Sequence, residues 1–174
     1  MAAQQTIIRV HQHDQTITLQ IEGQATMKHS PAVRQFAEQC FADDTMALSV
    51  DLRHCTHMDS TFLGTLLFLK RLVERREAGR FALIFPAPQC RQILQQMGLG
   101  KIFPIVDRIE LSVSVWGDLP SGPEDILAFK RNVVQAHQEL GQLEGPAGET
   151  FRELADQLAQ ELAAESLANQ QNKK

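Results

Sequence analysis

The sequence lacks the features that mark several specialised classes of protein. Its three cysteines, Cys40, Cys55 and Cys90, lie far apart and form no CxxC motif. This spacing indicates a protein of a reducing compartment and not a disulfide scaffold. The net charge of −4 gives no basic excess to attract nucleic acid. No basic start with an apolar stretch opens the sequence, and the longest apolar run is too short to cross a bilayer. These absences predict a cytoplasmic protein that binds neither nucleic acid nor a membrane.

Motifs for catalysis and for metal or phosphate binding are also missing. No GxSxG sequence surrounds a serine. Residues 98–101 read GLGK, but they lack the GxxxxGK[ST] frame and follow a predicted helix, so they are interpreted as a helix end. His11 and His13 share a strand face, and His54 and His57 lie close together, yet the spacing brings no three or four ligands to one point. We therefore expect no metal site and no cofactor.

The composition is that of an ordinary globular chain. Its 174 residues are 43% hydrophobic and 22% charged, which suits one domain with an appendage. Strand and helix periodicities alternate through the first two thirds. The predicted elements are a hairpin of strands at 6–11 and 15–21 ended by Gly23, a helix capped by Ser30, a strand at 47–52, a helix at 60–78 closed by Gly79, a strand at 81–85, a helix at 89–97 and a strand at 109–115. This order predicts an α/β fold with a mixed sheet of four or five strands.

The last third has a different character. Residues 117–123 read GDLPSGP, a linker by composition, and two amphipathic helices follow, separated by the Gly and Pro residues at 145–148. We therefore divide the chain into a domain at 1–117 and a two-helix extension at 118–174 whose last residues, 169–174, form a frayed tail. Because such helices are unstable alone, they must pack on the domain, on each other or on a second copy.

Residues 48–69 are the most informative block. An alternating strand runs into a polar loop, and Asp59 and Ser60 then begin a run with helical spacing. A rotation of about 100° per residue gives this helix two faces. The predicted core face carries Phe62, Leu66, Leu69 and Val73, and the opposite face carries Ser60, Gly64, Phe68, Arg71 and Arg75. Either Phe68 is exposed in a docking surface, or it packs under a neighbouring helix such as one of the C-terminal pair.

The serine at the start of this helix has three candidate roles. As a nucleophile, Ser60 would need an oriented base, and His57 in the preceding loop is the nearest histidine without an evident orienting group. Either Asp59 or Ser60 could cap the helix. If Ser60 were phosphorylated, the helix N-terminus would accept the added dianion, while a partner's acidic or apolar surface would reject it. The last role would change the chemistry of the surface without a large change of shape.

This block and its surroundings resemble a STAS domain, the fold of bacterial anti-sigma-factor antagonists and of the cytoplasmic tails of sulphate transporters. The resemblance spans about residues 6–116 and rests on LSVDLRHC, MDSTFLGTLL, the helix to Gly79, RFALIFP and QILQQMGLGKIFPI. It implies that Ser60 is phosphorylated by a partner kinase, with Thr61 as second choice, and that Asp59 aids recognition. The unmodified protein would bind a kinase-type anti-sigma factor, and a PP2C-type phosphatase would reset the cycle. The STAS protein itself would not be an enzyme.

The expected partner-binding residues are Asp59, Ser60, Thr61, Gly64, Phe68 and Arg71. Two departures from the family pattern lie close to them. Phe62 replaces a glycine found in many members, and residues 23–28 lack the acidic residue that often follows the second strand. An alternative function stays open, in which the chain is a non-switched scaffold or oligomerisation module and the C-terminal helices form a homodimer.

Overall fold

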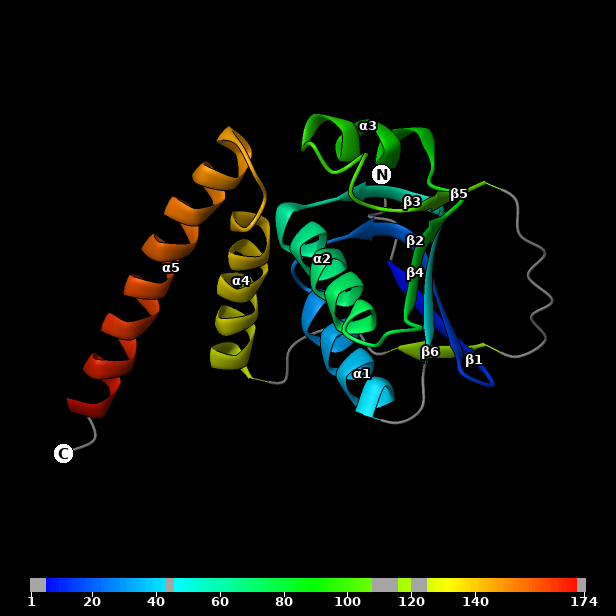
Figure 1. Ribbon diagram of the computed structural model, residues 1–174. Helices are drawn as coiled ribbons and strands as arrows, with labels where there is room; N and C mark the ends of the chain where they lie inside the picture. The colour runs from blue at the N-terminus through cyan, green and yellow to red at the C-terminus, as the bar shows by residue number, and fades with distance from the viewer. Residues whose placement is uncertain (1–5, 43–45, 108–115, 120–124, 172–174) are drawn as a thin grey trace, which may run out of the picture.

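A mixed sheet forms the centre of the fold (Figure 1). The computed structural model describes residues 6–42, 46–107, 116–119 and 125–171. Its strands are β1 (Ile7–His13), β2 (Thr16–Ala25), β3 (Ala47–Met58), β4 (Arg80–Ile84), β5 (Ile105–Val106) and β6 (Gly117–Leu119). They lie in the order β5-β4-β3-β2-β1-β6.

The pairing of the strands confirms the predicted mixed sheet. β1 pairs antiparallel with β2 through a tight turn in which Asp14 has a positive φ of 51°. The pairs β2–β3, β3–β4 and β4–β5 are parallel. The described residues form six strands instead of the four or five expected, because two short strands were not predicted: β5 pairs with β4, and β6, at the start of the expected linker, pairs antiparallel with β1. The strand predicted at 109–115 falls outside the described residues.

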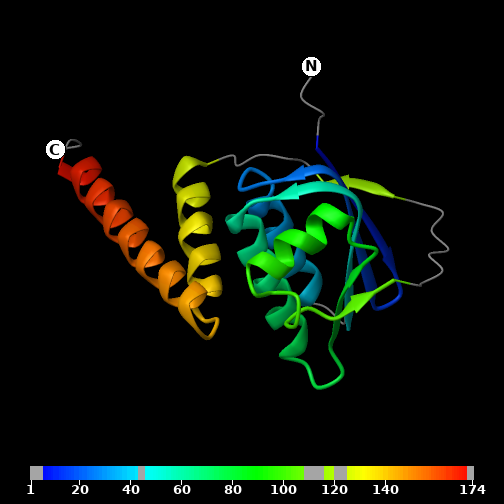
Figure 2. The same ribbon diagram turned by 90° about the horizontal axis from the view of Figure 1, so that it is seen from above.

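The helices are stacked outward from one face of the sheet. They are α1 (Ser30–Ala42), α2 (Ser60–Glu74), α3 (Pro88–Gln96), α4 (Ile126–Gly141) and α5 (Pro146–Gln171). α1 and α2 cover the sheet, α4 lies on the outer side of α2, and α5 lies on the outer side of α4 (Figure 1). The view from above shows the same layers, so the helical pair projects from one side of the domain (Figure 2).

The core lies between the sheet and the inner face of α2. Phe62, Leu66, Leu69 and Val73 each have 0% exposure, as their helical spacing predicted. Apolar side chains of the parallel strands β2, β3 and β4 meet them in one cluster. Since burial of each large apolar side chain contributes about 1.5–3 kcal/mol, this layer is the main source of stability.

Three local predictions from the sequence are wrong. β2 does not end at Gly23 but continues to Ala25, and Gly23, with a φ of 86°, lies at a register shift in the ladder. α2 ends at Glu74, and Gly79 is needed for close packing, because a Cβ there would lie 1.9 Å from the Val73 carbonyl oxygen. Ser30 is the first helical residue of α1, and its buried Oγ has no hydrogen-bond partner, so it does not cap the helix.

The C-terminal helices form a hairpin that packs on the domain. Asp125 caps α4, since its Oδ1 accepts a 2.9 Å hydrogen bond from the N–H of Leu127. Gly145, with a φ of 86°, makes the turn into α5, which is helical as far as Gln171 and therefore includes part of the expected tail. Among the described residues, no helix combines the length and the apolar character needed to cross a membrane. The two-domain division of the chain stays a prediction.

Candidate functional site

The carboxylate of Asp59 holds the start of α2 in place. Asp59 is the N-cap, and its Oδ1 accepts a 2.8 Å hydrogen bond from the backbone N–H of Phe62. Its Oδ2 accepts a 2.7 Å hydrogen bond from the N–H of Met27, between β2 and α1. The carboxylate therefore satisfies a free helix N–H and ties two segments together. Of the two residues that could cap the helix, Asp59 does so.

Ser60 follows the cap, and its hydroxyl contacts another helix. Ser60 Oγ lies 3.1 Å from Nε2 of His137 in α4. The other ring nitrogen, Nδ1, lies 2.8 Å from the carbonyl oxygen of Val133. Because a carbonyl only accepts hydrogen bonds, Nδ1 carries a proton and donates a hydrogen bond to Val133, and Nε2 is the nitrogen that faces the Ser60 hydroxyl. The serine hydroxyl is thus partly exposed and engaged by a residue 77 positions away.

One turn further along α2, Gly64 meets the backbone of α4. A Cβ built at Gly64 would lie 2.1 Å from the carbonyl oxygen of Ala136 and 2.8 Å from its Cα. Ala136 itself has 0% exposure. Only a glycine at this position of α2 allows the two helices to approach so closely.

Charged and aromatic side chains surround the next turns of α2. Arg71 forms an ion pair with Glu139 of α4. Phe68 is 7% exposed, and the guanidinium carbon of Arg34, in α1, lies 3.5 Å from the centre of its ring. Burial lowers the pKa of Arg34, although the charges of Glu38 and Glu139 act in the opposite direction. The face that carries the predicted site residues is therefore covered, with α4 as its main neighbour.

This arrangement decides between the two interpretations of Phe68. An exposed Phe68 in an open docking surface is wrong, because the side chain is buried. The alternative, in which Phe68 packs under a neighbouring helix, is confirmed: its ring contacts Arg34 of α1, while α4 covers Ser60 and Gly64 on the same face. Thr61 has 1% exposure and points into the fold, whereas Ser60 keeps partial access to solvent. The residues expected to bind a partner are brought together, but in contact with the chain itself.

Sequence reasoning missed the second half of the site. The imidazole that contacts Ser60 belongs to His137 and not to His57, the candidate base that the sequence places nearest to the serine. Glu139 and Arg34 were missed as well. One signal was present in the sequence. Ala136 is the smallest of the apolar residues that recur at helical spacing in α4, and Gly64 is the smallest residue on the outer face of α2. Small residues on two helices permit a close crossing, but many pairs fit that pattern.

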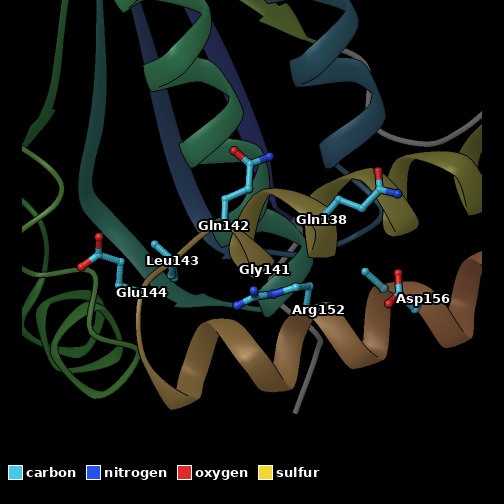
Figure 3. Close-up of a pocket in the computed structure, with 8 residues that line it drawn as sticks. Gln138, Gly141, Gln142, Leu143, Glu144, Arg152 and Asp156 are labelled. Atoms are coloured by element: carbon cyan, nitrogen blue, oxygen red, sulfur yellow. The ribbon is translucent and has the colours of Figure 1, made fainter.

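The contact between Ser60 and His137 has the form of a nucleophile and a base, with a backbone carbonyl as the orienting group. Such a pair acts on a substrate only where there is space beside it. A cavity of about 470 Å³ lies between the end of α4 and the first turns of α5, lined by Gly141, Arg152 and Asp156 among others (Figure 3). Neither Ser60 nor His137 is among its lining residues. The contact is therefore interpreted as part of the helix packing.

Metal ligands do not gather in the described part of the chain. Over residues 6–42, 46–107, 116–119 and 125–171, no three His, Cys, Asp or Glu side chains are placed to share an ion. The rings of His11 and His13 lie 6.3 Å apart on β1, which makes a pair and not a ligand set. Cys55 and Cys90 are buried free thiols, and Cys90 Sγ donates a 3.2 Å hydrogen bond to the carbonyl oxygen of Cys55.

The fold is similar to that of several solved structures. An anti-sigma factor antagonist from Mycobacterium paratuberculosis is 24% identical, with 60% of this chain and 88% of that one covered and a TM-score of 0.53. A Thermotoga maritima protein proposed to be an anti-sigma factor antagonist is 18% identical over 57% of this chain and 86% of that one, with a TM-score of 0.52. The Bacillus cell fate determinant SpoIIAA, in its phosphorylated form, is 20% identical over 57% and 91%, with a TM-score of 0.48. At these identities the similarity concerns the fold alone.

The sequence itself matches one family. No curated protein matches the chain. Residues 8–107, more than half of the chain, match the family described as "Mlab, STAS domain". The match spans β1 to β5 and ends before α4 and α5 begin. The resemblance found in the sequence is confirmed, and the chain belongs to the STAS domain family.

Proposed function

We propose that this STAS protein is an anti-sigma-factor antagonist that acts in the cytoplasm as a binding protein without catalysis of its own. The face of α2 that starts at Ser60 binds a kinase-type anti-sigma factor. Phosphorylation of Ser60 by that kinase ends the binding, and a PP2C-type phosphatase restores it. The observation that carries the proposal is that Asp59 caps α2, which leaves the Ser60 hydroxyl for a contact outside its own helix. The antagonists among the structures of similar fold support the same assignment.

The position of Ser60 suits a charge switch. A phosphate adds nearly two negative charges, and the N-terminus of α2 offers backbone N–H groups and a positive helix dipole that stabilise them. A partner that docks on the same face would have to desolvate this dianion or place its own acidic groups beside it. The helix therefore tolerates the modification that the complex rejects. Thr61, at 1% exposure, is a poor acceptor, so we assign the modification to Ser60.

The test begins with the protein purified from its native host. Mass spectrometry should locate a phosphate on Ser60, and co-purification should identify the kinase. Calorimetry with that kinase should then show that Ser60→Glu weakens binding by about 2 kcal/mol or more, roughly thirtyfold, while Ser60→Ala binds. Thr150→Glu is a matched control, because Thr150 is an exposed hydroxyl residue in the first turn of α5. If Ser60→Glu binds as tightly as Thr150→Glu, the switch is wrong.

A second function is suggested by exposed apolar side chains on the helical hairpin. Ile126 is 74% exposed and Leu167 is 61% exposed, and both large apolar side chains are available for contact with a second copy. In this alternative the protein is a non-switched scaffold that dimerises through the hairpin. Light scattering would show a dimer that Leu167→Glu converts to a monomer. A wild-type monomer over the whole concentration range would leave the switched antagonist as the better proposal.

A further inference from the structure

The face of α2 proposed to bind a partner already has an occupant. α4 contributes His137 to Ser60, the backbone of Ala136 to Gly64, and Glu139 to Arg71. These are the same α2 positions that the antagonist function requires. A kinase that phosphorylates Ser60, or a partner that covers Gly64, would have to replace α4.

The contacts also define what kind of helix fits this face. A Cβ built at Gly64 would lie only 2.1 Å from the backbone of α4, so the two helices approach very closely at this point. The occupying helix must therefore carry a small residue there, as α4 does with Ala136. Arg71 is ion-paired with Glu139, and the charge of Glu139 also reaches Arg34. The face therefore selects a helix with a small residue and, within one turn after it, a carboxylate.

Polar atoms without a hydrogen-bond partner are buried both in the core, at Asp51 of β3, and on the helices α1 and α4. Buried polar atoms without a hydrogen-bond partner occur in Ser30 and Arg34 of α1, and in Asn132 of α4. These atoms lie on helices that meet one another at the site. An unsatisfied buried polar atom opposes burial, so Asn132 of α4 would gain a hydrogen bond to water if the helix were released. An occupant held in this way can be exchanged for another.

We infer that the α4–α5 hairpin is an intramolecular competitor for the partner-binding face. In the closed form α4 covers Ser60 and Gly64. In the open form the face receives a partner helix with the same chemistry, a small residue opposite Gly64 and a carboxylate for Arg71. This inference rests on the proposed function for the importance of the face, but the closure itself is a property of the chain alone.

Closure can be measured through a thiol placed at the site. In the full-length protein carrying Ser60→Cys, the rate of labelling by N-ethylmaleimide at residue 60, separated from the half-buried Cys40 by peptide mass spectrometry, reports access to the start of α2. Ala136→Leu adds bulk where the two backbones meet and should raise that rate about tenfold or more, because overpacking displaces α4. Ala128→Leu is the matched control, since Ala128 is an exposed residue of the same helix, and it should leave the rate unchanged. The buried thiols of Cys55 and Cys90 report unfolding of the domain and should stay unlabelled in every variant.

Two further experiments, a charge exchange and an added peptide, test whether the labelling rate reports docking of the hairpin. Glu139→Lys is a milder variant that should raise the rate, and adding Arg71→Glu to it should lower the rate again by restoring opposite charges. A peptide spanning residues 125–171, added to the protein with Ser60→Cys and Ala136→Leu, should slow labelling. The same peptide carrying Ala136→Leu should not.

Two results would overturn the inference. One is a rate that neither Ala136→Leu nor Glu139→Lys changes. The other is equal acceleration at Cys55, Cys90 and the introduced thiol, which would make the hairpin inseparable from the domain fold. Both results are read without any partner protein. The absence of Ser60 phosphorylation would instead count against the proposed function and leave the closure intact.

Discussion

The two faces of α2 form interfaces of opposite kinds. Toward the sheet, the helix presents Phe62, Leu66, Leu69 and Val73, all fully buried among apolar neighbours. Toward α4, the same helix presents a hydroxyl, a glycine and an arginine, whose partners are an imidazole, a backbone and a carboxylate. The first interface is purely apolar, whereas the second combines the buried apolar side chain of Leu140 with three polar or backbone contacts that water or another protein could replace.

This difference separates what the helix contributes to stability from what it contributes to recognition. Apolar burial depends on area and tolerates no exchange of partner without unfolding. Polar groups and a close backbone contact depend on geometry, so their net free energy is small and a competitor with the same geometry can replace them. The hairpin should therefore leave the domain under conditions in which the sheet stays folded.

The largest expected effect is on the sheet side. Leu66→Ala removes a fully buried side chain and should lower the free energy of unfolding by about 2–5 kcal/mol. Leu127→Ala makes the same chemical change on α4 at 37% exposure and should cost less than about 1 kcal/mol. Chemical denaturation followed by Trp116 fluorescence measures both, because the single tryptophan lies beside His11 of β1, next to the edge strand β6. Equal losses of unfolding free energy in the two variants would contradict the difference drawn between the two faces of α2.

A smaller effect is expected on the α4 side, where a substitution should weaken docking of the hairpin without lowering the stability of the sheet side. Gly64→Ala forces the Ala136 backbone to move, which should weaken hairpin docking by about 1–3 kcal/mol. Alanine is also the better helix former by about 1 kcal/mol, so the sheet side should be no less stable. Hydrogen exchange should rise across α4 while the strands stay protected. Gly100→Ala is the control, since its added Cβ comes no closer than 3.5 Å to Gln95, an ordinary van der Waals contact. Loss of protection in the strands as well would show that the two faces act as one unit.

The sequence predicted the sheet side of α2 far better than the α4 side. Helical spacing located Phe62 and Leu66 because a core face needs only apolar residues at a fixed period. Spacing does not identify the covering element, so the pairing of Ser60 with His137 was not predictable from local pattern. Gly79 shows the same limit, because a glycine near a helix end suggests a left-handed cap, whereas here it makes room for the Val73 carbonyl. Contacts between distant segments depend on the assembled fold.

The smallest effect is a pH dependence that belongs to the domain and not to the hairpin. His29, 8% exposed just before α1, has a pKa lowered from its ordinary value of 6.5, mainly by burial, although the charge of Asp59 raises it. Below pH 6.5 the unfolded chain therefore binds a proton that the native domain rejects, so stability should fall as the pH drops through that value and be unaffected above it.

Denaturation followed by Trp116 fluorescence should show a steeper loss between about pH 7.5 and about pH 5.5 for the wild type than for His29→Gln. The remaining histidines are common to both proteins, so the difference isolates His29. If that difference appeared instead in the labelling rate of the thiol from Ser60→Cys, with fluorescence unchanged, then His29 would control the hairpin, and the division between a stable face and an exchangeable face would be drawn in the wrong place.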